Sequence, residues 1–152
     1  MTQKNKVTQK RERNLIALLS GFCAFVFMSS TFRNITLSYE LGKDDTGTFI
    51  WQMIPESVAL LLMAFCAGLV IRMLYNLKHK RIFIPENVRL VQYLGLAVLI
   101  YGVFLSIWKH VSPVETVGFM RDAFLLLGGF ILLIGSVFKA GIRMKEEQDL
   151  TI

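Results

Sequence analysis

Charged residues are missing from four stretches of the 152-residue sequence, although 18% of the chain is Asp, Glu, Lys or Arg. These stretches cover 14–32, 57–71, 90–108 and 123–138. A transmembrane helix needs about 20 apolar residues, so each stretch predicts one membrane-spanning helix. The remaining chain is too short to form a soluble domain, and a hydrophobic content of 54% excludes an ordinary soluble protein.

We therefore expect an all-α integral membrane protein, a single domain over 1–152 that folds as a compact antiparallel bundle. The four expected helices cover 14–33, 54–75, 88–108 and 121–140, and a cytoplasmic tail follows over 141–152. The second and fourth charge-free stretches are short for a full crossing. The long side chains of Arg72 and Lys139 are expected to extend toward the interface and so complete these two spans.

The basic residues are distributed unevenly along the chain. Thirteen of the 17 Lys and Arg residues lie before the first helix, around the link between the second and third helices, or after the fourth helix. Positively charged segments are retained in the cytoplasm, which predicts cytoplasmic termini and a multi-pass protein of the cell inner membrane. Trp51 and Trp108 are then expected at the outer interface, where amphipathic rings are favoured.

The sequence is also poor in residues that carry chemistry. Cys23 and Cys66 fall inside apolar stretches, which argues against a disulfide, and His79 and His110 have no other ligand at metal-binding spacing. Phosphate-binding loops, dinucleotide motifs and nucleophile elbows are absent, and no ionisable group lies at mid-membrane depth. We expect no enzymatic activity, no cofactor, no metal site and no direct binding of nucleic acid, because the basic residues flank apolar runs.

Four charged residues are predicted to lie at one depth near the outer face. Arg33 ends the first helix, Glu56 begins the second, and Arg121 and Asp122 begin the fourth. They form a candidate ion-pair cluster across the bundle. Such a cluster serves either to fix the order of the helices or to respond to an external ligand.

The cytoplasmic link and tail hold the candidate contacts to lipid headgroups or to a partner protein. These are Lys78, Lys80, Arg81, Glu86, Asn87, Glu146, Glu147, Asp149 and Leu150. Pro85 and Glu86 suit the first turn of a helix. The alternative interpretation is that the basic link only sets the topology and that the tail is a solvated helix end.

Small residues recur at helical spacing and predict close packing of the helices. The pairs are Ala17 with Gly21, Ala64 with Gly68, Gly95 with Gly102, and Gly128 with Gly135. We expect these pairs to pack within the bundle. Self-association into a homo-oligomer is the alternative.

Two segments of the sequence resemble a family of small bacterial membrane proteins, the domain of unknown function 2975 family. The first runs over 82–90 into the third helix, and the second runs from Phe138 to Ile152 at the end of the chain. The family often has a serine at the position of Ile84, so a helix cap is missing here. The resemblance implies a four-helix layout and neighbouring genes for small helix-turn-helix regulators.

These observations predict a membrane-embedded regulatory or sensory protein that contacts lipids and controls a cytoplasmic helix-turn-helix transcription regulator. Two alternatives stay open. One is a small transporter or pore with Gln92, Tyr101 and Ser106 along a path in the third helix. The other is an accessory subunit of a larger membrane complex.

Overall fold

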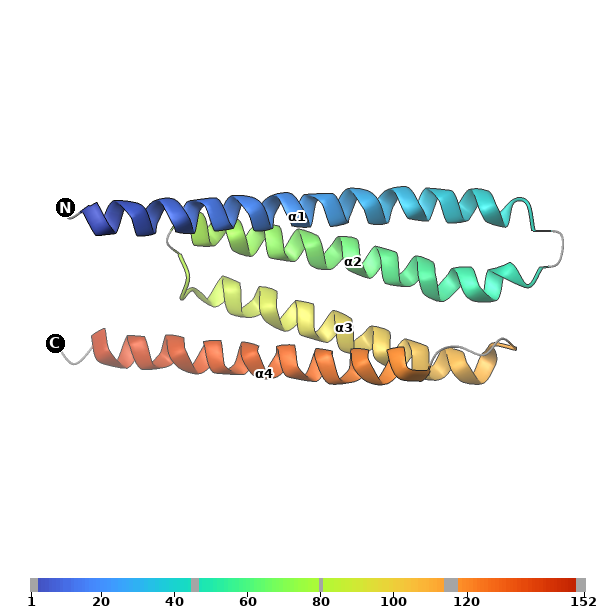
Figure 1. Cartoon of the computed structure of the whole chain (residues 1–152). Coiled ribbons are helices and arrows are strands. Elements are labelled where there is room, and N and C mark those ends of the chain that lie inside the picture. The colour runs from blue at the N-terminus through green and yellow to red at the C-terminus, as the bar shows by residue number, and fades with distance from the viewer. Residues whose placement is uncertain (1–2, 45–46, 80, 114–117, 150–152) are drawn as a thin grey trace.

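The computed structural model describes residues 3–44, 47–79, 81–113 and 118–149, and these residues form four α-helices and no strand. The helices are α1 (Gln3–Leu41), α2 (Phe49–Lys78), α3 (Pro85–Val111) and α4 (Gly118–Asp149) (Figure 1). Even the shortest helix, α3 with 27 residues, exceeds the roughly 30 Å hydrocarbon layer at about 1.5 Å per residue. All four are long and apolar enough to cross a membrane, and the chain is a multi-pass membrane protein.

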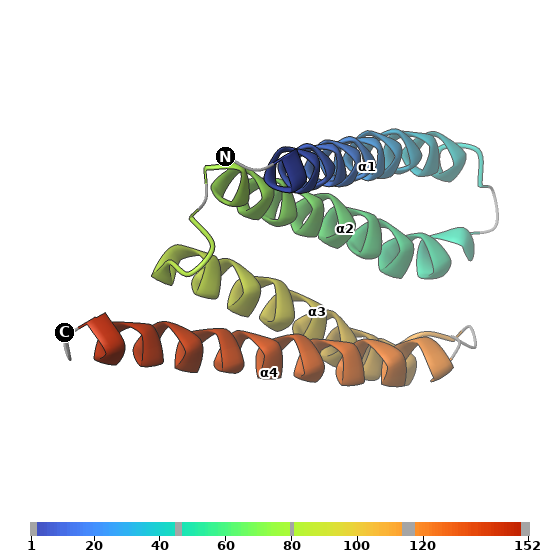
Figure 2. The same cartoon turned by 60° about the vertical axis from the view of Figure 1, so that its left-hand side comes forward.

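Successive helices run antiparallel, so both ends of the chain and the α2–α3 link lie at the same end of the molecule (Figure 1). Helix α1 packs on α2, α2 on α3, and α3 on α4. Within the described residues no other pair of helices comes close. The predicted all-α four-helix architecture is confirmed, but the expected compact closure is not found, because the α1–α2 and α3–α4 hairpins meet only through α2 and α3 (Figure 2).

Helices α3 and α4 pack closely through glycines. A Cβ atom added to Gly128 would lie 2.7 Å from the backbone nitrogen of Leu99, and one added to Gly102 would lie 3.0 Å from that of Leu125. Gly95 approaches Leu132 equally closely, and Gly135 lies against Gln92. The pairs predicted from the seven-residue spacing therefore do bring these two helices together.

The α1–α2 hairpin does not use its glycines in this way. A Cβ atom on Gly21 or Gly68 would meet nothing within 4 Å, and both residues are exposed. The prediction that Ala17 with Gly21 and Ala64 with Gly68 pack inside the bundle is therefore wrong for both glycines. Apolar residues surround these helices on all sides, so the spacing alone does not distinguish the packed face from the lipid face.

The loop before α2 contains a glycine in a left-handed conformation. Gly47 has a positive φ of 67°, a conformation that glycine adopts without steric cost. The Asp44 carboxylate accepts a hydrogen bond of 2.9 Å from the backbone N–H of Phe49, the first residue of α2. This bond satisfies one of the free donors at the start of the helix.

We predict that Gly128→Ala lowers the free energy of unfolding in detergent by about 1–3 kcal/mol, because its Cβ would collide with backbone atoms of Leu99. Gly129→Ala is the matched control, since a Cβ there meets nothing within 4 Å. Chemical unfolding in mixed micelles measures both variants. Equal free energies of unfolding for the two variants would show that α3 and α4 move apart at Gly128 without loss of stability.

Candidate functional site

The α2–α3 link is held by two buried asparagines. The side-chain amide of Asn76, near the end of α2, donates a 2.8 Å hydrogen bond to Oδ1 of Asn87 in the first turn of α3. Nδ2 of Asn87 donates in turn to the backbone carbonyls of Arg81 and Ile82, each at 2.8 Å. Asn76 is 8% exposed and Asn87 is 5% exposed. Together they fix the conformation of the link from both sides.

An ion pair joins the same two helices beside these amides. Nη2 of Arg72 lies 2.7 Å from Oε1 of Glu86, and Nε lies 3.0 Å from the same oxygen. Both side chains are more than 40% exposed, so water and headgroups screen the pair and its contribution to stability is at most about 1 kcal/mol. Arg72 is therefore paired with Glu86 across the two helices, and its extension toward the membrane interface stays a prediction.

The start of α3 has no side-chain cap, as expected from Ile84 in place of serine. Ile84 has an extended backbone and makes no capping bond, while Pro85 occupies the first turn. Asn87 is the third helical residue, and from this position a side chain reaches back over the residues before the helix. The asparagine bonds therefore order the link before α3, although they do not supply the acceptor that a serine cap would offer to the helix N–H groups.

At the opposite end, a proline interrupts α2. Pro55 lacks an N–H, so the carbonyl of Trp51, four residues earlier, has no donor at the usual helical position. The indole Nε1 of Trp108 on α3 donates a 3.2 Å hydrogen bond to this carbonyl. A second donor from α3, the hydroxyl of Tyr101, bonds the carbonyl of Pro55 at 3.0 Å. Side chains of α3 therefore contact α2 on both sides of the interruption.

Aromatic packing supports these two donors. The ring centroids of Trp51 and Trp108 lie 5.5 Å apart, and Phe104 lies between Tyr101 and Trp108 along the same face of α3. Phe124 of α4 meets Tyr101 edge to face at 4.8 Å. The cluster joins α2, α3 and α4 at the end of the molecule opposite to the α2–α3 link, and such contacts add to the effect of buried area.

The four charged residues that were expected to form one cluster near the outer face form two separate ion pairs. Nε of Arg33 lies 3.1 Å from Glu56 and joins α1 to α2, and its Nη1 also contacts Glu40 at 3.2 Å. Arg121 pairs with its own neighbour Asp122 at 2.7 Å within α4. Because α1 and α4 do not approach each other, the expected four-residue cluster is not formed.

A family model described as a protein of unknown function, DUF2975, matches residues 53–152, about two thirds of the chain. The chain belongs to the DUF2975 family. No curated protein and no solved structure matches it.

The DUF2975 match begins in the second turn of α2 and continues through α3 and α4. It therefore contains Asn76, Asn87, Pro55, Tyr101 and Trp108, the residues that tie α2 to α3 at both ends. Helix α1 lies outside the matched residues and, among the described helices, packs on α2 alone. The Asn76–Asn87 and Tyr101–Pro55 hydrogen bonds thus lie within the family region, whereas Trp51, the acceptor of the Trp108 bond, precedes it by two residues.

Among the cytoplasmic contacts predicted for this DUF2975 chain, Lys78 and Arg81 are exposed on the link, and Glu146 and Glu147 are exposed on α4. Glu147 lies 3.7 Å from Arg143, one turn earlier. The prediction that Asn87 contacts a partner or lipid headgroups is wrong, because its side chain is buried and orders the link. Lys80, Leu150 and the side chain of Asp149 lie outside the described residues.

The three residues suggested to line a transport path in α3 do not lie together. Tyr101 is buried against α2 and α4, the Gln92 side chain lies beside Gly135, and the Ser106 hydroxyl donates to the Gly102 carbonyl of its own helix. These three residues do not line one surface. Sequence reasoning missed the two roles that do emerge, for Asn76 and for Trp108 opposite Pro55.

We predict that Asn87→Ala lowers the free energy of unfolding by about 1–3 kcal/mol, because it leaves buried polar groups of Asn76 and the link without partners. Amide exchange at Arg81, whose N–H bonds the Asn76 carbonyl, is expected to accelerate. The exposed Asn14→Ala is the control. Unchanged exchange in both variants would contradict the role given to Asn87.

We predict that Trp108→Phe costs about 0.5–1.5 kcal/mol of stability, since it removes the donor to Trp51 while keeping an aromatic ring. The cost is expected to shrink in a Pro55→Ala background, where an alanine N–H supplies the missing donor. A double-mutant cycle in detergent measures this coupling. Additive effects would show that Trp108 does not compensate for the proline.

Proposed function

We propose that this protein is a regulatory membrane protein of the cytoplasmic membrane whose basic end binds a soluble cytoplasmic regulator. The observation that supports it most is the fixed α2–α3 link. Buried amides hold this segment in one conformation, while Lys78 and Arg81 remain exposed on it. A preorganised polar surface loses less entropy on binding a protein than a mobile one does.

The ends of α1 and α4 enlarge this surface. Helix α4 continues from its charge-free stretch to Asp149, which adds about 16 Å at 1.5 Å per residue. Helix α1 begins 11 residues before its own charge-free stretch, at the same end of the molecule (Figure 1). Exposed charges of both signs lie on α4 at Arg143, Lys145 and Glu146. Mixed charge of this kind suits a protein partner, whose surface carries both signs.

The connection between the two faces of the membrane supports a sensory role. Helix α2 is bonded to α3 near the outer end through Trp108 and near the basic end through Asn87 and Glu86. A displacement of the outer loop therefore acts on a helix pair that also positions the basic link. The partner class comes from the family resemblance, which implies a small helix-turn-helix transcription regulator.

The test uses the intact chain with the regulator encoded beside its gene. With the natural chain present, we expect the regulator to co-sediment with membranes. With the double variant Glu146→Lys and Glu147→Lys, we expect the co-sedimenting fraction of the regulator to fall severalfold. These substitutions add positive charge to a segment already predicted to be cytoplasmic, so the orientation is preserved. Glu146→Asp with Glu147→Asp keeps the charge and is the control.

Two results would overturn this proposal. One is a regulator that stays in the soluble fraction when the natural chain is present. The other is photocrosslinking from position 146 in native membranes that recovers only lipid and copies of the chain itself.

A further inference from the structure

The two hairpins are joined mainly at the two ends of the α2–α3 contact, which is the least extensive helix contact among the described residues. At one end, beside the link, Asn76 bonds to Asn87. At the other end, the side chains of Tyr101 and Trp108 bond to α2. Asn87 and Tyr101 lie 14 residues apart on α3, which separates the two ends by about 21 Å at 1.5 Å per residue.

The end beside the link, which we call the link end, resists separation. The chain itself connects α2 to α3 here, and Asn87 also holds the carbonyls of Arg81 and Ile82. Asn76 and Asn87 are both buried, so moving them apart would leave polar groups without partners. The link end is therefore suited to act as a hinge, where the angle between the helices changes while they stay in contact.

The opposite end is held by weaker means. We call it the latch, and it consists of Trp51 and Pro55 on α2 with Tyr101 and Trp108 on α3. Its two hydrogen bonds, of 3.2 and 3.0 Å, join neutral groups, and its tryptophan rings lie 5.5 Å apart. Neutral hydrogen bonds of this kind contribute modestly to stability.

The position of the latch lowers the cost of opening it. Trp51 is the third residue of α2, and Trp108 lies three residues before the end of α3. Indole rings favour the membrane interface, where water can bond to the Trp51 carbonyl and the Trp108 N–H once they separate. Tyr101 keeps its ring contacts with Phe104 and Phe124 inside the α3–α4 hairpin.

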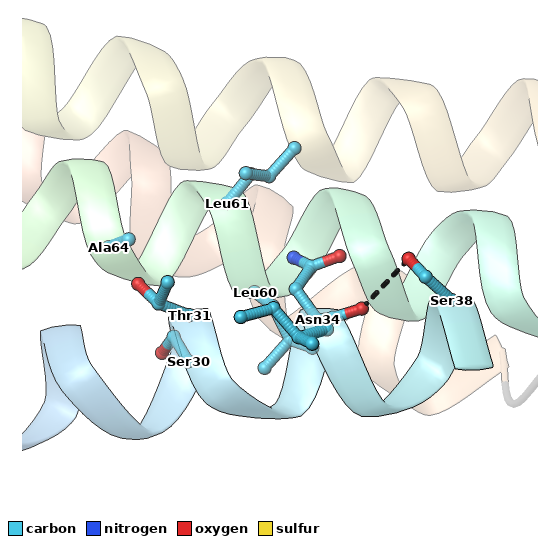
Figure 3. Close-up of a pocket in the computed structure, with 8 residues that line it drawn as sticks. Ser30, Thr31, Asn34, Ser38, Leu60, Leu61 and Ala64 are labelled. Carbon is cyan, nitrogen blue, oxygen red and sulfur yellow. Dashed lines mark hydrogen bonds between the residues drawn. The ribbon is translucent and has the colours of Figure 1, made fainter. Parts of the chain in front are cut away.

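Each hairpin is internally held and can move as one body. Helices α3 and α4 approach so closely that a Cβ atom on Gly128 would lie 2.7 Å from the backbone nitrogen of Leu99. In the other hairpin, Leu37 of α1 is fully buried, and Asn34 points toward α2 (Figure 3). The Asn34 amide exchanges two hydrogen bonds with Ser57 of α2, so α1 follows any tilt of α2.

We propose that the α1–α2 hairpin tilts about the link end and that the latch opens and closes with this motion. The structure is the closed state. Over a lever of about 21 Å, a tilt of about 15° moves Trp51 and Trp108 about 5 Å further apart. The motion needs no cytoplasmic partner, so its test stands apart from the binding of a regulator.

The test measures distances between spin labels on the full-length chain in lipid nanodiscs, after replacement of Cys23 and Cys66 by alanine. The latch pair of labels is attached to cysteines at Ile50 of α2 and Val111 of α3, which are exposed residues near the latch. In the natural background we expect one main distance and a minor population about 5 Å longer.

A second pair of labels, at the exposed Tyr75 and Tyr93, reports on the link end. The double variant Trp108→Phe with Tyr101→Phe removes both donors of the latch. We expect it to raise the longer latch population about fivefold or more, the effect of losing neutral hydrogen bonds, and to leave the link-end distance unchanged. Tyr39→Phe, at an exposed tyrosine of α1, is the control.

A measurement without labels uses the natural fluorescence of the latch. Trp51 and Trp108 are the only tryptophans of the chain, and Tyr101→Phe retains both of them. Because this conservative change removes one latch bond, we expect aqueous iodide to quench the tryptophans about twofold faster in the variant than in the natural chain.

Three results would overturn the proposal. The first is a single latch distance in the natural chain and in the double variant alike. The second is equal broadening of both label pairs, which would show a general loosening of the fold in place of a hinge. The third is iodide quenching that Tyr101→Phe leaves unchanged.

Discussion

Backbone hydrogen bonding governs this structure, because the hydrocarbon layer offers no water to a free N–H or carbonyl group. Long helices satisfy the requirement over most of the chain. Helical hydrogen bonding is incomplete toward the two ends of α2, outside its charge-free stretch 57–71: at Pro55, which leaves the Trp51 carbonyl without a helical donor, and at the link, where α2 ends and α3 begins. Side chains of α3 bond to the backbone at both places, Trp108 to Trp51 and Asn87 to the link. The contacts between α2 and α3 are thus placed where the backbone needs them.

The existence and order of the four spans could be predicted from the sequence because they depend on local composition. Charge-free stretches locate the helices, and the glycine spacing of α3 and α4 locates their contact. The reach of the helices was underestimated, since α1 and α4 extend well beyond the apolar stretches. Charged residues end a hydrophobic run without ending a helix, because Lys, Arg and Glu are good helix formers.

Pairings between helices were harder to predict. Arg33 and Glu56 were matched correctly by depth and charge, but Arg121 and Asp122 were added to the same cluster although they lie on a helix that does not approach α1. The depth of a residue in the membrane does not show which helices are neighbours. The Asn76–Asn87 bond depends on the conformation of the link, although the position of Asn87 in the first turn of α3 was a usable signal. A proline in one apolar helix and a tryptophan at similar depth in another was a second such signal.

The two outer helices are attached to the α2–α3 pair by different physical means. Helix α4 lies so close to α3 that an added methyl group at Gly128 would meet backbone atoms, so any sliding of α4 must carry α3 with it. Helix α1 instead meets α2 around the fully buried Leu37, the Asn34–Ser57 bonds and an exposed ion pair, and its own glycine is free of contact. The least extensive helix contact among the described residues is the one between α2 and α3, so the two hairpins are held to each other mainly by the hydrogen bonds and aromatic contacts at its two ends. Helix α1 also lies outside the DUF2975 match, so its contacts with α2 are not part of what defines the family.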